Sequence, residues 1–164
     1  MAELTNLESK LGEVLGLAMA AQGATEKVKK LDDLDGDLAN ALDRMHDEAK
    51  QAEERATKVA GEFEGKKTAI LDEAREVKQK ATEMMRDYLD RDADALDGFE
   101  FLTMAEAGEV GHWEILKTLN ERARNAQLRE LCDWAIPIQQ RHFEDVRAGS
   151  LQLAAEEDPN ETSG

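Results

Sequence analysis

The sequence predicts an all-α protein, and three observations carry that prediction. Of the 164 residues 35% are charged and only 4% are aromatic, and the chain has two prolines and eleven glycines. A β sandwich or barrel needs many turn signals, which this composition does not supply. Apolar residues instead recur at steps of three and four over long stretches, which is the period of an amphipathic helix.

Five segments carry this period, and we expect each of them to form one helix. The predicted helices span residues 3–30, 37–64, 66–93, 97–122 and 126–153. The segment from Leu31 to Gly36 reads as a turn and helix start, and Gly65 is a plausible stop for the second helix.

The first two predicted helices have continuous apolar stripes. On the first the stripe is Leu4, Leu7, Leu11, Leu15 and Ala18, continued by Gln22. On the second it is Leu38, Leu42, Met45, Ala49, Ala52, Ala56, Val59 and Phe63. The central alanines of the second helix would let another helix, or a ligand, come close.

The other three predicted helices also have apolar stripes. On the third the stripe is Ile70, Ala74, Val77, Ala81, Met84 and Tyr88. On the fourth it is Phe101, Met104, Ala105, Ile115, Leu116 and Leu119. On the fifth it is Leu128, Leu131, Ala135, Ile138, Val146 and Leu153, with Cys132 on the same side. Pro137 lies inside the fifth helix on its outward side, where we expect a kink.

Short connections predict two antiparallel hairpins, one from the first and second helices and one from the fourth and fifth. The third helix would then be a long crossover between them. Four bundled helices with one long crossover form the ferritin-like up-down arrangement. We therefore expect a single ferritin-like helical domain over residues 1–153 and a disordered acidic tail over residues 154–164.

Charge and cysteine content limit the function classes. The chain has 21 Lys and Arg against 37 Asp and Glu, a formal net charge of -16, which disfavours nucleic acid and anionic membranes as partners. No apolar run reaches the roughly 20 residues of a membrane span. The N-terminus lacks a signal-peptide pattern, and the single cysteine excludes an internal disulfide framework. A cytoplasmic protein is the expectation.

Polar side chains interrupt the predicted stripes at compatible heights in the middle of the bundle. His112 falls at the centre of the fourth stripe and Glu109 on its edge, and their Glu-x-x-His spacing lets both address one point. Gln139 and His142 face inward on the fifth helix with the same spacing. On the second helix, His46 and Glu48 flank the stripe.

These residues suggest a metal site, because carboxylate bundles hold two ions with glutamates and Glu-x-x-His pairs from four helices. The candidate metal ligands are Glu109, His112, His142, Glu48 and His46. The alternative is that the inward polar groups only hydrogen-bond to one another. Gln22 and Gln139 favour this alternative, because amides are poor ligands for hard divalent metals.

The segment Met104-Ala105-Glu106-Ala107-Gly108-Glu109-Val110-Gly111-His112-Trp113-Glu114-Ile115 resembles the signature of the YciF-like ferritin-like stress-protein family. That signature reads valine, glutamate, histidine, tyrosine, glutamate, isoleucine. His46-Asp47-Glu48-Ala49 with Glu54-Arg55 resembles the acidic motif of the family's second helix, and the likeness covers about residues 10–153. The resemblance implies a five-helix bundle, a homodimer, a bacterial stress role and a two-metal site of iron or manganese.

The chain departs from that signature at several acidic positions. Gly111 stands where the signature has its glutamate, and Gln139 and Gln140 stand where the family has acids. We therefore expect a degenerate site with iron or manganese, or no metal, in a stress-related protein with oxidative chemistry. The alternative is a non-catalytic helical scaffold or dimeric interaction protein without metal, and iron storage is a third, less favoured reading.

Overall fold

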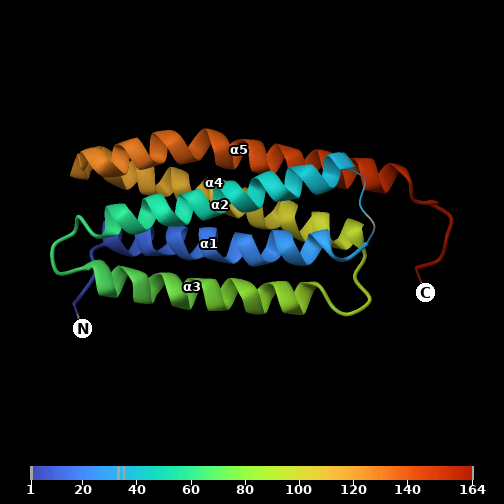
Figure 1. The fold of residues 1–164 in the computed structure, drawn as a ribbon, viewed down its shortest axis with the longest axis horizontal. Helices are drawn as coiled ribbons and strands as arrows, with labels where there is room; N and C mark the ends of the chain where they lie inside the picture. The colour runs from blue at the N-terminus through green and yellow to red at the C-terminus, as the bar shows by residue number, and fades with distance from the viewer. Residues whose placement is uncertain (1, 33, 35, 164) are drawn as a thin grey trace.

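The computed structural model describes residues 2–32, 34 and 36–163, and these contain five helices and no strand (Figure 1). The helices are α1 (Asn6–Lys29), α2 (Gly36–Ala60), α3 (Lys67–Tyr88), α4 (Ala95–Ala123) and α5 (Ala126–Ala155). The all-α prediction is confirmed, although α3 ends earlier than expected. Met1 and Gly164, and Asp33 and Asp35 in the predicted turn, lie outside the described residues.

Side-chain caps explain where three helices begin. At α1 the Thr5 hydroxyl accepts from the Glu8 N–H at 3.1 Å, and the Glu8 carboxylate accepts from the Thr5 N–H at 2.9 Å. Asp94 and Asp97 form the same reciprocal box at α4, and the Asn125 side chain caps α5. Such caps satisfy N–H groups that have no partner within the helix. The cap at Asp94 is the reason that α4 starts at Ala95.

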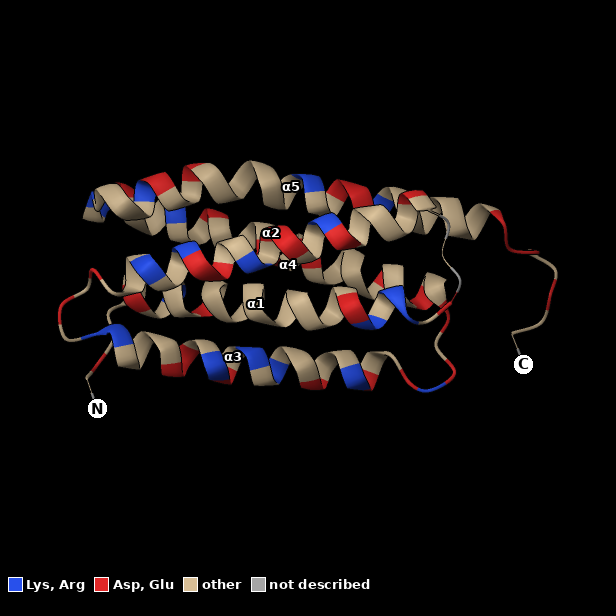
Figure 2. Cartoon of the chain, in the orientation of Figure 1, with Lys and Arg blue, Asp and Glu red and all other residues tan. Residues whose placement is uncertain are grey.

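Helix α1 is the centre of the arrangement. It packs against α2, α3 and α4, while α5 packs against α4 and α2. Figure 1 shows α1 and α2 running in opposite directions, α4 and α5 doing the same, and α3 lying along α1. Residues 14–25 of α1 contain no charged side chain, and this stretch is tan in Figure 2. A helix with neighbours on three sides needs such a broad apolar surface.

Two apolar cores fill the two ends of the bundle. The first contains Leu11, Val14, Leu15, Ala56, Val59, Ala60, Ile70, Ala74, Trp113, Leu116, Leu128, Leu131, Cys132 and Ala135. The second contains Ala24, Val28, Leu38, Leu42, Met45, Leu89, Phe99, Phe101, Leu102 and Val146. On α2, α4 and α5 the polar residues of interest lie in sequence between these two sets. The predicted core positions of α2 are confirmed almost throughout, as are the buried Cys132 and the exposed Pro137.

The predicted core face of α4 is partly wrong. Met104 and Ile115 are 48% and 46% exposed, although both were placed on the apolar stripe. The buried positions of the helix are Ala95, Gly98, Phe99, Phe101, Leu102, Glu106, Glu109, Trp113, Leu116 and Asn120. Hydrophobicity misplaced the face because two acids occupy inward positions while large apolar side chains remain on the surface.

No helix in the described part of the chain has both the length and the apolar character needed to cross a membrane.

Candidate functional site

Five polar side chains from three helices meet between the two apolar cores. They are Glu48 on α2, Glu106 and Glu109 on α4, and Gln139 and His142 on α5, and we call them the buried acid cluster. A cavity of about 10 Å³ is lined by Glu48, Glu109, Gln139 and His142. That volume is about the size of one water molecule. Glu106 joins the group through a hydrogen bond from Gln139.

The local sequence explains why these side chains point inward. On α4, Leu102, Glu106, Glu109, Trp113 and Leu116 follow one another at steps of four and three, and all of them are buried. This spacing keeps the residues on one face of a helix. The apolar members are anchored in the two cores, so they hold the two acids between them.

Glu48 is bound by two neighbouring side chains of α5. Arg141 donates to both of its oxygens, at 3.0 and 2.5 Å, and Nε2 of His142 lies 3.1 Å from Oε1. Burial raises the pKa of Glu48, but the hydrogen bonds from Arg141 and His142 outweigh it and the net pKa is lowered. This carboxylate is therefore ionised at neutral pH.

His142 is almost completely buried, and its other ring nitrogen lies 3.9 Å from Glu106. Burial lowers the pKa of His142 and outweighs the opposing effect of Glu48. The imidazole is consequently neutral at pH 7, which is the form that binds metal ions.

Glu106 and Glu109 have no comparable partner. They are 1% and 6% exposed. Burial raises the pKa of Glu106 to about 7, against the hydrogen bond from Gln139, which lowers it. Burial, with the negative charge of Glu106, raises the pKa of Glu109 well above its ordinary value. Within the described residues Glu109 makes no ion pair, so the two acids share a site that favours either protons or an added cation.

The structure brings together three of the five predicted ligands. Glu48, Glu109 and His142 belong to the cluster, and Glu109 is buried rather than on the edge of the core face.

His112 lies elsewhere. Its ring nitrogen Nδ1 is 3.2 Å from Glu13 and 3.3 Å from the Lys10 ammonium, and about a third of its side chain is exposed. Its predicted position at the centre of the core face is wrong, because the buried face of α4 runs through Glu109 and Trp113 instead.

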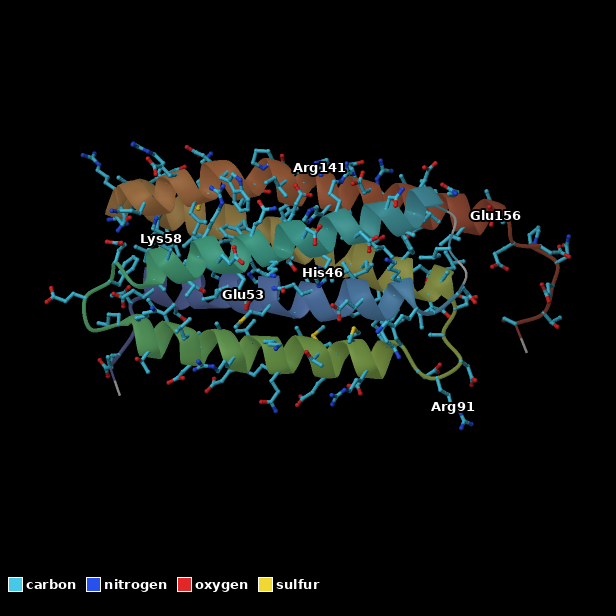
Figure 3. The ribbon with its side chains drawn as sticks, in the orientation of Figure 1. His46, Glu53, Lys58, Arg91, Arg141 and Glu156 are labelled. Carbon is cyan, nitrogen blue, oxygen red and sulfur yellow. The ribbon has the colours of Figure 1, made fainter. Side chains whose placement is uncertain are left out.

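His46 also lies outside the cluster. Its Nε2 atom is 3.0 Å from Glu26 on α1, and its Nδ1 atom is 3.5 Å from Asp47. Figure 3 shows His46 and Glu53 near the boundary of α2 with α1, and Arg141 on α5. Gln22 donates to Glu53 at 3.2 Å rather than to a core group.

Sequence reasoning missed Glu106 and Arg141. The Glu106-x-x-Glu109 pair was visible, and its spacing relative to Leu102 and Trp113 could have identified both acids as inward. No sequence pattern predicts the role of Arg141, because that role depends on its contact with Glu48 of the neighbouring helix α2.

The donor types of the cluster are carboxylate oxygen and imidazole, which suit iron and manganese. In the side-chain positions of the described residues, no three or more His, Cys, Asp or Glu groups converge closely enough to hold a metal ion. The side of the cavity formed by α1 consists of Ala18 and Ala21, so this helix contributes no donor there.

Comparison of the chain with protein-family models, with curated proteins and with solved structures finds no match.

Proposed function

We propose that this chain is a ferritin-like bundle whose buried acid cluster binds one divalent ion, iron or manganese. The observation that carries the proposal is the pair of neighbouring buried acids Glu106 and Glu109. Among the described residues no positive charge neutralises them, and the only hydrogen bond to the pair is the one that Gln139 donates to Glu106. Burial of uncompensated carboxylates is costly, and proteins avoid it by pairing them or by binding metal. The adjacent pairs α1–α2 and α4–α5, with α3 between them in the chain, support the ferritin-like arrangement.

The residues present fit one ion better than two. Glu106, Glu109 and His142 supply two carboxylates and one neutral imidazole, and Gln139 orients Glu106. Glu48 is already held by Arg141, and α1 offers only alanines. A second dication would lack negative ligands. Bound iron or manganese would supply electron transfer to oxygen or peroxide, and we place this chemistry in a bacterial stress response on the strength of the resemblance.

The protein residues have separable roles in this proposal. Glu106 and Glu109 must lose their protons to bind the ion, so affinity rises with pH. Arg141 fixes Glu48, which in turn accepts a hydrogen bond from His142 Nε2 and leaves Nδ1 on the side of Glu106. A carboxylate on the far nitrogen of a ligand histidine is a common orienting device.

Elemental analysis of untagged protein after reconstitution with Mn²⁺ or Fe²⁺ tests the proposal. We expect about one ion per chain, and none in Glu109→Gln or His142→Ala. His112→Ala is the matched control and should keep full occupancy, because His112 lies outside the cluster. Unchanged metal content in His142→Ala would refute the assignment, and a loss in His112→Ala would restore His112 as a ligand.

A second candidate is a metal-free helical interaction protein, including a homodimer. The bidentate pair of Arg141 with Glu48, completed by His142, favours it because this part of the core is hydrogen-bonded without metal. Absence of stoichiometric metal, together with a melting temperature insensitive to Mn²⁺ and to chelator, would support this candidate over the first.

A further inference from the structure

A groove of about 240 Å³ lies between α1, α3 and α4. Its lining is mostly apolar and includes Met84 and Met85 of α3 and Met104 of α4, with alanines of α1. Glu106 and Glu109 also line it. The groove therefore combines an apolar passage with the two unneutralised acids of the core.

Small residues keep this groove open. Ala20 and Ala24 on α1 and Ala81 on α3 face it with single methyl groups, and Gly108 on α4 has no side chain. A Cβ added at Gly108 would have no atom within 4 Å, so helix packing does not require glycine there. Glycine in the middle of a helix is unfavourable relative to alanine. Its presence leaves open space beside Glu109.

Glu109 is the one acid of the groove without a protein partner. It is 94% buried and, among the described residues, makes no hydrogen bond or ion pair through its carboxylate. Every completely enclosed side-chain nitrogen or oxygen in that part of the chain does have a hydrogen-bond partner. The Glu109 oxygens are consequently not completely enclosed, and they border the open space of the groove or of the small cavity.

We propose that the groove binds a small amphipathic amine, with its alkyl chain against the methionines and alanines and its ammonium group against Glu109. Methionine side chains adapt to apolar ligands of varied shape. An ammonium group is the complement of a buried carboxylate, and a charge-assisted hydrogen bond between them is about twice as strong as a neutral one. An alcohol offers no positive charge to stabilise the ionised form of Glu109, and a fatty acid would add a negative charge beside Glu106 and Glu109.

This inference does not depend on the metal. Because an ammonium group and a metal ion would neutralise the same acids, the two ligands exclude each other. Octylammonium should therefore weaken Mn²⁺ binding, whereas octanol should not.

Calorimetric titration of the metal-free chain with octylammonium, octanol and octanoate tests the inference. We expect octylammonium to bind at least about tenfold more tightly than octanol, and octanoate to bind most weakly. Between hexylammonium and octylammonium each added methylene should tighten binding by about threefold to fourfold.

Two variants separate the contribution of the ligand's head group to binding from the contribution of the apolar groove. Glu109→Gln should remove the preference for octylammonium over octanol while octanol still binds. Gly108→Leu should weaken both ligands by at least about tenfold, because the new side chain fills the groove. Gly111→Leu is the matched control: it is also a glycine of α4 with open space around its Cβ, but it does not line the groove.

Octanoate binding as tightly as octylammonium would overturn the proposal, as would equal binding by Gly108→Leu and Gly111→Leu. Sedimentation measurements give a further contrary outcome: a wild-type dimer that Gly108→Leu converts to a monomer assigns the groove to a second copy. Failure of the metal proposal and failure of the amine proposal can be distinguished. Gly108→Leu leaves Mn²⁺ stoichiometry unchanged, whereas His142→Ala abolishes Mn²⁺ binding and leaves Gly108 and the groove lining intact.

Discussion

Glu106 lies in the core with a pKa of about 7, raised by burial. Because the pKa is higher in the folded chain than the ordinary value of 4.5, Glu106 does not disfavour the fold below pH 4.5; its destabilising effect grows between pH 4.5 and about 7 and is complete above pH 7. We expect Glu106→Gln to stabilise the metal-free protein at pH 8 by on the order of 3 kcal/mol and at pH 5 by less than about 1 kcal/mol. Urea unfolding at both pH values measures the difference.

Glu114 provides the control for this prediction. It is exposed on the same helix, and Glu114→Gln should change stability by less than about 0.5 kcal/mol at either pH. Titrating groups far from Glu106 are common to both variants and cancel in the comparison, whereas Glu109 and His142 face Glu106 and their altered titration is part of the Glu106→Gln effect. A Glu106→Gln effect that does not differ between pH 5 and pH 8 would contradict the raised pKa.

His112 and Glu106 differ in burial, and this difference shows how far hydrophobic periodicity predicts which residues of α4 face the core. His112 was placed inward because Met104, Ile115 and Leu119 define an apolar side of the helix. The structure leaves Met104 and Ile115 half exposed and buries Glu106. Residue polarity is a weak guide where the core contains acids, since these residues supply less stability than apolar side chains would. The 4-3 spacing of Leu102, Glu106, Glu109 and Trp113 was the better signal.

The capping box of α1 connects a single side chain to the stability of a whole helix. Thr5→Ala removes the hydroxyl that accepts from the Glu8 N–H, and we expect a loss of about 1 kcal/mol at pH 7. Burial raises the pKa of Glu8, but the bonds from the Thr5 backbone and from Lys66 outweigh it and lower the pKa. The carboxylate's contribution is present above 4.5 and is lost as pH falls, but it depends mainly on the Thr5 backbone N–H and on Lys66, which the variant keeps, so Thr5→Ala should cost about the same at pH 3 and pH 7.

Thr118→Ala is the comparison for this cap. Thr118 is exposed in the C-terminal part of α4, where its hydroxyl donates only to the Glu114 carbonyl. Alanine is the better helix former there, so stability should stay equal or rise slightly. Chemical denaturation measures the stability of both variants. Equal losses of stability in Thr5→Ala and Thr118→Ala would show that Thr5 does not cap α1.

Helix α3 can approach α1 closely because Gly16 has no side chain. A Cβ at this position would lie 2.4 Å from the Ala74 carbonyl oxygen, a backbone atom that cannot move aside cheaply. Gly16→Ala should therefore separate the two helices and destabilise the protein by about 1–3 kcal/mol, despite the better helix propensity of alanine. Thermal unfolding measures the loss.

Gly23→Ala is the matched control on the same helix, since a Cβ there meets nothing within 4 Å. It should stabilise the chain by up to about 1 kcal/mol. A stabilising Gly16→Ala substitution would mean that α3 does not pack on α1 as closely as described.

The positions of the helices were more predictable from the sequence than the buried face of each helix. Five long periodic segments and their short connections identified all five elements, because hydrophobic periodicity and glycine or acidic breaks act locally. The end of α3 was missed because Asp90 to Asp94 contains no glycine or proline. The signal that separates α3 from α4 is the Asp94–Asp97 capping box, whose reciprocal bonds define the start of α4.

On the scale of the whole molecule, the buried acid cluster divides the core into two apolar parts. On α2 it falls between Met45 and Ala56, and on α5 between Ala135 and Val146. A continuous apolar core would be more stable, so the polar layer is the feature that structural stability does not explain. Its presence at the same level of three helices is the reason for assigning it a binding role.

Helix α3 is the element least secured by this divided core. Its buried residues, Ala69, Ile70 and Ala74, all lie in the first half, and the second half borders the groove. Regions with few buried contacts open locally at lower free energy than the rest of the fold. We expect backbone amides of residues 77–88 to exchange hydrogen at least about tenfold faster than those of residues 14–25 of α1.

Hydrogen exchange followed by mass spectrometry checks this expectation, and octylammonium extends it to the groove. A ligand seated between α3 and α4 should slow exchange in residues 77–88, because it binds the closed form and not the open one. The Gly108→Leu variant should show slow exchange there without ligand, since its side chain occupies the same space. Equal protection of α1 and the second half of α3 in the free wild-type chain would show instead that α3 is part of one cooperative unit, with a groove that does not open.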